Sequence, residues 1–216
     1  MNILFEDHDL MVLDKPAGLS TESGHASHPS AEKLAQELFH QKQPESRRIP
    51  YLRAVHRLDR ASGGVLVLAK SKQALTELMR QFEQRLVKKT YQALTDHAPK
   101  HDSGVLSHWL KRDESGKKAL VFDQNMPGTQ PCALEYKVLE RRDGMALLEI
   151  YPETGRFHQI RAQLAHIGCP IYGDVLYGGP LWQEHKIKLQ AIRLYFMHPR
   201  TNTPVTIEAP WDAWSL

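Results

Sequence analysis

The chain has 216 residues, 41% of them hydrophobic and 25% charged, with a formal net charge of +3 at pH 7. This composition is ordinary for a globular protein and allows a sizeable core. No apolar run approaches the roughly 18 residues needed to span a bilayer, so a membrane protein is not expected. The first residues lack the basic and apolar segments of a secretory signal, which favours a cytoplasmic protein.

Cysteine and histidine usage argues against a disulfide framework and a metal site. Cys132 and Cys169 have no Cys-x-x-Cys spacing, so both are expected to be free thiols. Among twelve histidines the closest pair considered is His25 and His28, and no second ligand pair stands at metal-binding spacing. Solvated or hydrogen-bonded histidines are therefore expected, with no metal and no cofactor.

Basic charge is concentrated in one part of the chain. Residues 47–100 contain 12 Lys and Arg against 4 Asp and Glu. Such a surplus favours a polyanionic partner such as nucleic acid. The alternative is an ordinary solvated face.

The N-terminal part predicts a hairpin, a turn and a helix. Residues 3–5 and 10–13 have the pattern of two short strands. In residues 14–18, Pro16 and Gly18 predict a sharp turn. Ser30 can cap a helix that ends near residue 41, and residues 43–50 are the best candidate for a mobile loop.

The segment of residues 55–70 places one carboxylate next to a predicted buried strand. Asp59 stands between Arg57 and Arg60, and a Ser-Gly-Gly turn leads into the apolar residues 65–69. Asp59 is therefore expected on a loop at the edge of a sheet, where catalytic groups are often mounted. The alternative is a surface carboxylate paired with its two neighbouring arginines.

Further elements follow in the middle of the chain. Ser71 can cap a helix that ends near residue 85, and residues 88–94 read as a strand whose Tyr91 is either a core or a functional residue. Residues 96–130 are polar and interrupted by Gly and Pro, which indicates a long connection with one strand near residues 105–110. Strands at residues 132–140 and 145–151 flank an Asp-Gly turn.

The C-terminal third contains a second dense stretch, residues 153–161, which is expected to open a helix ending at Gly168. On such a helix His158 would lie about 100 degrees from Phe157, and Arg161 near the edge of the packed face. Strands are predicted at residues 188–197 and 205–208. Because no repeat or low-complexity linker is present, residues 1–216 are expected to form one domain of mixed strands and helices.

Several of these segments match one family in order. The matching blocks are Asp14-Lys15-Pro16-Ala17-Gly18, His56-Arg57-Leu58-Asp59 running to Lys70, Lys89 with Tyr91, and Thr154-Gly155-Arg156 with His158-Gln159-Ile160-Arg161 running to Gly173-Asp174. With them the chain resembles the RluA-type pseudouridine synthases, which isomerise a uridine within an RNA chain. The resemblance spans nearly the whole sequence.

The resemblance implies an α+β catalytic domain with a largely antiparallel central sheet, flanking helices and a basic RNA-binding cleft. It implies Asp59 as the nucleophile, Tyr91 as the ring stacked on the target base, and Arg161 as the cation paired with Asp59. The residues expected to bind RNA are Arg57, Arg60, Lys88, Lys89, Arg156, His158, Gln159 and Ile160. The expected partner is ribosomal RNA, transfer RNA or both. A monomer without an S4 module or protein partner is expected.

The chain departs from the family pattern after the aspartate and in two later positions. Ser62-Gly63 stands where the family usually has Thr-Ser, which questions the stiffness of this loop. Gln163 and Gln190 stand where histidine is common, and both keep hydrogen-bonding capacity without titrating. They either tune RNA contacts or have no effect.

Two other functions compete with the isomerase. One is an RNA-binding or folding factor that kept the cleft and lost turnover, motivated by Ser62-Gly63. The other is a glycoside or nucleoside hydrolase, motivated by the single carboxylate. Hydrolases of this kind usually need two carboxylates around the bond, and no acid partner for Asp59 is evident.

Overall fold

A computed structural model describes residues 1–22, 28–42 and 50–215. Their contacts form two compact units, which we treat separately: Met1–Lys88 with Ala191–Pro210, and Lys89–Gln190 with Trp211–Leu216. His25 and most of the expected mobile loop, residues 43–49, lie outside the described residues. That residues 1–216 form one domain stays a prediction.

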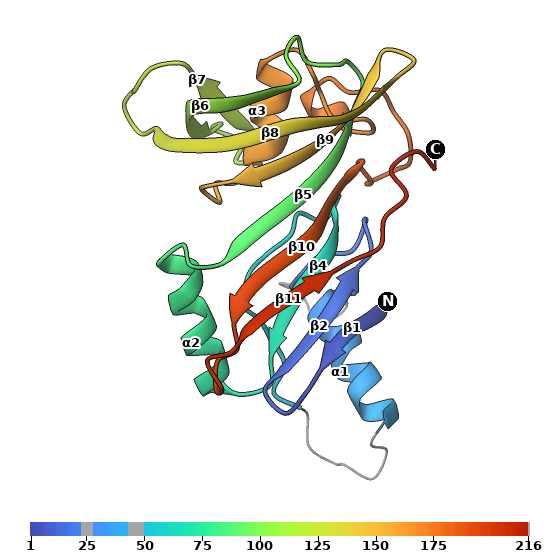
Figure 1. Ribbon diagram of the computed structural model, residues 1–216, viewed down its shortest axis with the longest axis vertical. Coiled ribbons are helices and arrows are strands. Elements are labelled where there is room, and N and C mark those ends of the chain that lie inside the picture. The colour runs from blue at the N-terminus through green and yellow to red at the C-terminus, as the bar shows by residue number, and fades with distance from the viewer. Residues whose placement is uncertain (23–27, 43–49, 216) are drawn as a thin grey trace. The chain divides into compact units, whose positions relative to one another are not determined.

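The first unit is built on a sheet with the strand order β1, β2, β4, β10, β11. The described pairings of β1 with β2, β2 with β4, and β10 with β11 are antiparallel, as is the pairing of the short β3 with β4 (Figure 1). All seven residues of β4 are buried, as its apolar sequence predicts. The strands are β1 (Asn2–Glu6), β2 (Leu10–Lys15), β3 (Arg53–Ala54), β4 (Gly63–Ala69), β10 (Leu189–Met197) and β11 (Pro204–Glu208).

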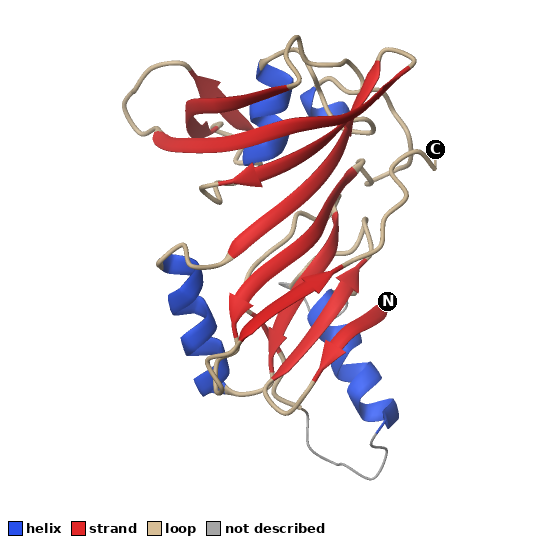
Figure 2. Ribbon diagram, viewed as in Figure 1, coloured by secondary structure: helices blue, strands red, loops and turns tan. Residues whose placement is uncertain are grey.

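Two helices complete this unit, α1 (Ala31–Lys42) and α2 (Lys72–Glu83) (Figure 2). Ser71 caps α2 as predicted, because its side chain accepts the N–H of Ala74 at 3.1 Å. The side chain of Gln81 exchanges two 3.0 Å hydrogen bonds with the backbone of Met197 and thereby links α2 to β10. The core between α2 and the sheet includes Leu10, Val12, Val65, Val67, Ala74, Leu78, Leu194 and Phe196.

The second unit contains the strands β5, β9, β8, β6 and β7 in that order, and every neighbouring pair is antiparallel. The helix α3 packs against β6 and β7 with a core that includes Leu110, Ala119, Cys132 and Ala162. The elements are β5 (Lys88–Thr95), β6 (Ser103–Arg112), β7 (Ala119–Phe122), β8 (Gln130–Arg142), β9 (Met145–Pro152), α3 (Gln159–His166) and the 3-10 helix η1 (Val175–Tyr177).

Two sequence expectations in this unit have different outcomes. The Asp-Gly turn between β8 and β9 is confirmed, because Asp143 and Gly144 both have positive φ, +52° and +82°. The long connection predicted at residues 96–130 needs a correction in part. The strand predicted near residues 105–110 is confirmed as β6, which is longer than expected, but the connection also contains β7, which was not predicted. The four residues of β7 stand between polar, Gly-containing segments that made this stretch look like a loop.

The predicted mixed fold of helices and largely antiparallel strands is confirmed. No helix in the described part of the chain is long and apolar enough to cross a membrane. The residues of the matching blocks are divided between the two units.

Candidate active site

Asp59 lies on the loop between β3 and β4, directly before the buried strand, as the sequence predicts. Its side chain is half-buried. The backbone N–H and the hydroxyl of Ser62 both donate to the carbonyl of Asp59, each at 3.1 Å. These two bonds close a turn over residues 59–62, so Ser62 supplies the hydroxyl that stiffens this loop.

The segment after β2 holds this turn on both sides of the carboxylate. Thr21 Oγ1 donates to the carbonyl of Leu58 at 3.0 Å and accepts its N–H at 3.1 Å. The N–H of Gly18 donates to the carbonyl of Arg60 at 2.7 Å, and Arg60 Nε donates back to the carbonyl of Gly18 at 3.1 Å. Reciprocal bonds to both neighbours of Asp59 fix the direction in which its side chain leaves the backbone.

Lys15 provides a third contact between the two segments. Its side chain is fully buried, and Nζ donates to the carbonyls of Pro16, Leu19 and Ser62 at 3.1, 2.7 and 2.6 Å. These three acceptors match the three N–H donors of an ammonium group. Burial lowers the pKa of Lys15 to about 8, and the negative charges of Asp59 and Asp14 oppose part of this decrease.

The residues just before Asp59 alternate between packed and exposed. His56 Nε2 accepts the N–H of Val67 at 3.3 Å, and its ring stacks on Phe82 with the centroids 4.9 Å apart. Arg57 is exposed, and Leu58 is 6% exposed. His56 therefore anchors the loop, whereas Arg57 faces solvent in this unit.

In the second unit, Arg161 is buried on α3 and forms a two-pronged ion pair with Asp174. Arg161 Nε lies 2.7 Å from Asp174 Oδ2, and Nη2 lies 2.8 Å from Oδ1. Asp174 is 1% exposed and Arg161 is 6% exposed. Such parallel bonds fix the plane of a guanidinium group as well as its position.

A further contact orients the same guanidinium and determines which ring nitrogen of His158 carries the proton. Arg161 Nη1 lies 2.8 Å from His158 Nε2, and His158 Nδ1 lies 3.1 Å from the hydroxyl of Tyr177. Because a guanidinium only donates, Nε2 is the acceptor, so the proton of neutral His158 is on Nδ1 and points to Tyr177. The Arg161 Cζ also lies 5.1 Å from the Tyr177 ring centroid.

The start of α3 differs from the sequence expectation. The helix begins at Gln159, and His158 before it has a left-handed φ of +53°. The rings of Phe157 and His158 therefore stack with centroids 3.8 Å apart, instead of lying about 100 degrees apart on a helix. Gln159 stabilises this entry, because its Oε1 accepts from Thr154 Oγ1 and from the N–H of Arg156 at 2.7 and 3.0 Å.

The predicted RNA-binding residues differ in exposure. Arg60 and Lys88 are exposed like Arg57, whereas Lys89, Arg156 and His158 are half-buried. Gln159 and Ile160 are only 4% and 7% exposed. Gln159 Nε2 donates to the carbonyl of Ala133 at 3.0 Å, so its amide is engaged within the protein at both ends. RNA contact by these residues stays a prediction.

Tyr91 and Lys89 lie on β5, where Tyr91 is half-buried and paired in register with Ile150 of β9. Burial lowers the pKa of Lys89. Its Nζ lies close to Gly155, because a Cβ at that glycine would be 3.4 Å from it. Lys89 thus borders the loop that carries Arg156.

The two glutamines that replace histidines in the family pattern are both buried. Gln163 is 0% exposed, and its Nε2 donates to the carbonyl of Leu106 at 3.1 Å and to His108 Nδ1 at 3.0 Å. Gln190 is 8% exposed. The Gln163 amide links α3 to β6, and an effect of either glutamine on RNA contacts stays a prediction.

Among the residues that the structure describes, two clusters of His and Asp have the composition of a metal site. In the first, His108, His166 and Asp123 approach one another, and His166 Nε2 lies 2.9 Å from Asp123 Oδ1. Because Gln163 donates to His108 Nδ1, the proton of neutral His108 is on Nε2, which faces Asp123. A metal would need that nitrogen without its proton.

The second cluster, Asp7, Asp9 and His198, is also held by hydrogen bonds. His198 Nδ1 accepts the N–H groups of Arg200 and Thr201 at 3.3 and 3.2 Å, so its proton is on Nε2, 2.8 Å from Asp7 Oδ2. Burial opposes ionisation of Asp7, but the N–H groups of Leu10 and Asp9 and the contact with His198 outweigh it and lower the pKa. We interpret both clusters as structural networks.

Three residues of the site were not singled out individually from the sequence: Lys15, Thr21 and Asp174. Lys15 and Asp174 belong to the matching blocks, so the blocks themselves carried a signal for them. Thr21 has no such signal, because its role depends on Leu58, which lies 37 positions away in the sequence.

Comparison with known proteins identifies the family. A family model described as RNA pseudouridylate synthase matches residues 9–166. An uncharacterised RNA pseudouridine synthase of Bacillus subtilis is 32% identical over 99% of this chain and 69% of its own length. The ribosomal large subunit pseudouridine synthase C of Buchnera aphidicola is 31% identical over 97% of this chain and 67% of its own length.

A solved structure supports the same fold. Human RNA Pseudouridylate Synthase Domain Containing 4 superimposes with a TM-score of 0.76 at 24% identity, covering 97% of this chain and 88% of the human chain. Together with the matching blocks around Asp59 and Arg161, these findings show that the chain belongs to the RluA-type RNA pseudouridine synthase family, whose members are isomerases acting on RNA.

Proposed function

We propose that this protein converts a specific uridine of structured RNA to pseudouridine and that Asp59 is its nucleophile. The observation that carries this proposal is the turn at Asp59, which Lys15, Gly18 and Thr21 hold by backbone and side-chain hydrogen bonds. A carboxylate that must attack one atom of a bound nucleotide needs such a fixed position, because misplacement is costly to the rate.

The reaction needs no external reagent. The bond from C1′ of the ribose to N1 of the uracil breaks, the uracil rotates, and a bond from C1′ to C5 forms. The proton on C5 then leaves and N1 gains a proton, so the product is an isomer of uridine. One carboxylate can act first as the nucleophile and then as the base that accepts the proton from C5. The proposed mechanism therefore uses Asp59 in both steps and calls on no metal or redox cofactor.

The target base must leave the RNA stack before Asp59 can reach it. Flipping a base costs a few kcal/mol, and stacking on an aromatic ring returns about 1 to 3 kcal/mol. We propose that Tyr91 supplies this ring. Its place on β5, held in register with β9, gives the ring a rigid support.

We propose Arg161 as the cation that keeps Asp59 ionised, as the family resemblance implies. The described bonds to Asp174 and His158 fix the position and the plane of its guanidinium group. An ionised carboxylate in a closed site is costly unless a cation is paired with it, and a guanidinium held in this way suits that role. Asp174 acts in this proposal as a positioning residue that fixes the plane of the guanidinium.

The proposed RNA contacts are led by the exposed and half-buried cations, among them Arg57, Arg60, Lys88, Lys89 and Arg156, together with His158. The burial of Gln159 and Ile160 supports a role in shaping the loop before α3. Ribosomal RNA is the first substrate class to test, because the Buchnera relative is named a ribosomal large subunit pseudouridine synthase. Transfer RNA is the second, and a monomeric state and a cytoplasmic location remain predictions.

The test is to map pseudouridine in total RNA from cells with and without the gene, and then to add the purified protein to RNA from the deleted strain. We expect at least one uridine to lose its modification in the deleted strain and to regain it with the wild-type protein. Asp59→Asn should fold and bind RNA but restore nothing. Full activity of Asp59→Asn would refute the nucleophile assignment.

The same experiment separates the two competing functions. An RNA-binding factor would bind the RNA and leave its pseudouridine content unchanged at long incubation. A hydrolase would release free uracil, which chromatography of the supernatant would detect.

A further inference from the structure

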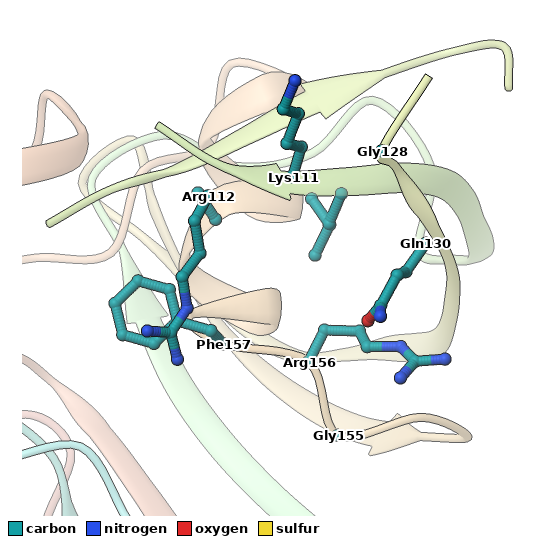
Figure 3. A pocket seen from close by; sticks show the side chains of 9 residues that line it. Lys111, Arg112, Gly128, Gln130, Gly155, Arg156 and Phe157 are labelled. Carbon is teal, nitrogen blue, oxygen red and sulfur yellow. The ribbon is translucent and has the colours of Figure 1, made fainter. Parts of the chain in front are cut away.

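A pocket of about 350 Å³ lies within the second unit, between the β6–β7 hairpin and the loop before α3. Its lining includes Lys111, Arg112, Gly128, Gln130, Arg156 and Phe157 (Figure 3). The floor is formed by Leu110 and Ala119, which belong to the core against α3. The pocket therefore has a packed apolar base and a basic rim.

The two arginines are held in place by different contacts. The guanidinium of Arg112 lies over the ring of Phe157, with its Cζ 4.0 Å from the ring centroid. Arg156 Nε donates to the carbonyl of Pro131 at 3.3 Å. Figure 3 shows the Arg112 guanidinium beside the Phe157 ring and the Arg156 side chain extending away from it. Both arginines are thus held at the rim of the pocket, in different directions.

The charge around the pocket is one-sided. Three of its lining residues are cations, and none of the described lining residues is a carboxylate. The acidic residues nearest to the lining in sequence are Asp113 and Glu114 in the β6–β7 turn and Glu153 in the loop before α3. Asp113 accepts from the hydroxyl of Ser115 at 2.7 Å and from the N–H of Lys118 at 3.1 Å, so its charge is used within the turn.

The same residues connect the pocket to Arg161. Arg112 lies on Phe157, Phe157 stacks on His158 at 3.8 Å, and His158 Nε2 lies 2.8 Å from Arg161 Nη1. The pocket is therefore next to the residues that orient the proposed catalytic cation. The lining residues do not include Asp59 or Tyr91, which are the residues proposed to attack and to stack on the target base.

We propose that this pocket binds one nucleotide of the RNA substrate outside the target uridine, with the phosphates that flank this nucleotide held by Arg112 and Arg156. The inference rests on the proposed function, and it adds the β6–β7 hairpin to the RNA-binding surface. Guanidinium groups suit this ligand because their paired donors match phosphate oxygens and their planes stack on bases. The volume fits a single nucleotide and is too small for a folded RNA element.

The test compares variants with the same loss of charge. Arg112→Gln and Arg156→Gln change the pocket, and Lys117→Gln is the matched control, because Lys117 is exposed in the same hairpin turn and does not line the pocket. Binding of a short fluorescein-labelled RNA hairpin is followed by anisotropy from about 50 to 200 mM salt. Thermal denaturation checks that each variant folds.

We expect each pocket variant to bind roughly tenfold more weakly and to lower the salt slope by about 1, with Lys117→Gln within about twofold of wild type. Arg112→Lys should recover the salt slope but only part of the affinity, because lysine keeps the positive charge but lacks the planar guanidinium group. Equal affinities and slopes for Arg112→Gln, Arg156→Gln and Lys117→Gln would overturn the proposal.

Pseudouridine formation in RNA from the gene-deleted strain is measured separately with the same proteins. If the wild-type protein forms no pseudouridine while the pocket variants lose affinity as expected, the proposed reaction fails and the RNA-binding pocket stands. If the wild-type protein forms pseudouridine while the pocket variants bind like Lys117→Gln, the pocket proposal alone fails.

Discussion

At the scale of single residues, the position and the proposed ion pair of Asp59 depend on two charged residues that are distant from it in sequence, Lys15 and Asp174. Lys15 donates to the carbonyl of Ser62, which closes the turn at Asp59. Asp174 holds both prongs of Arg161, the proposed partner of Asp59. Each supporting residue gives a prediction that does not require the RNA target to be known.

Lys15 should make stability depend on pH in the alkaline range. Below about pH 8 the amine is protonated in the folded and unfolded states, and the folded protein bears the full cost of the buried charge. Between about 8 and 10.5 only the unfolded state binds this proton, so the free energy of unfolding rises with pH. We expect this contribution to be about 3 kcal/mol.

Urea denaturation of the wild type and Lys15→Met from pH 7 to pH 10.5 measures this effect. The difference in unfolding free energy should grow with pH in favour of the wild type, while Lys89 and Lys188, whose pKa values are also lowered by burial, contribute equally to both proteins. Parallel pH profiles would contradict the assignment. Lys15→Met should also lower kcat more than RNA affinity, because it loosens the turn at Asp59.

Asp174 should be essential to the fold around Arg161. Asp174→Ala leaves a buried guanidinium without its carboxylate and should lower the unfolding free energy by about 3 to 5 kcal/mol. Asp174→Asn keeps the volume and one acceptor and should cost less. Urea denaturation compares the two, with Asp102→Ala as the control, because Asp102 pairs with Arg141 at the surface and should cost under about 1 kcal/mol. Equal effects of Asp174→Ala and Asp102→Ala would refute the prediction.

At the scale of elements, the loop that carries Asp59 is held because β4 starts with a close approach to β10. Gly64 has a φ of +114°, and a Cβ there would lie 2.2 Å from the carbonyl oxygen of Ala191. Gly64 is also the residue opposite Lys15 in the pairing of β2 with β4. The second glycine after the loop thus joins three strands beside Asp59.

Gly64→Ala should therefore destabilise the protein far more than an ordinary glycine replacement. Strain at positive φ costs about 1 to 2 kcal/mol, and the overlap with Ala191 adds roughly as much again or more. Gly116→Ala is the matched control, because Gly116 has a φ of +68° and nothing within 4 Å of its Cβ position. Differential scanning calorimetry measures the melting temperatures of both variants. Equal melting temperatures would show that β4 and β10 can move apart at residue 64 and Ala191 at little cost.

At the scale of the whole molecule, the proposed catalytic residues belong to different units. Asp59 lies in the unit of β4, and Tyr91 and Arg161 lie in the unit of β5 and α3. The pairing of Asp59 with Arg161 rests on the family resemblance, so it needs a test of its own. A double-mutant cycle provides one, because it isolates the interaction between two groups from their other contacts.

We expect a coupling free energy of about 1 kcal/mol or more between Asp59→Asn and Arg161→Gln, measured by urea denaturation in an Asp174→Asn background. This background removes the unpaired buried carboxylate that Arg161→Gln would otherwise leave. Additivity within about 0.5 kcal/mol would show that the two side chains do not interact in the folded protein. The same cycle with Arg57→Gln in place of Arg161→Gln tests the alternative pairing of Asp59 with its neighbour.

Much of the fold follows from local patterns. Periodicity and capping predicted β4, α2 and the hairpin of β8 and β9 close to their observed bounds, because burial on one face imposes a repeat on the sequence. In the connection of residues 96–130, the predicted strand near residues 105–110 is β6, whereas β7 was missed because its four residues stand between polar segments that contain glycine. The start of α3 was predicted too early. The Gln159 side chain accepts hydrogen bonds from Thr154 and Arg156 and holds the residues before it as a loop where a helical turn was expected.

The sequence by itself determined the family, the loop that carries Asp59 and the strand that supports it, because these depend on residue types at fixed spacing. Only the tertiary structure decided that Lys15 donates hydrogen bonds to three carbonyls and that Asp174 forms an ion pair with Arg161. It also decided that Gln163 is buried against His108 and that Arg112 and Arg156 line the same pocket. The physical reason is that these hydrogen bonds and this burial form between segments far apart in the sequence. Contacts of this kind leave no local periodic pattern in the sequence from which they could be predicted.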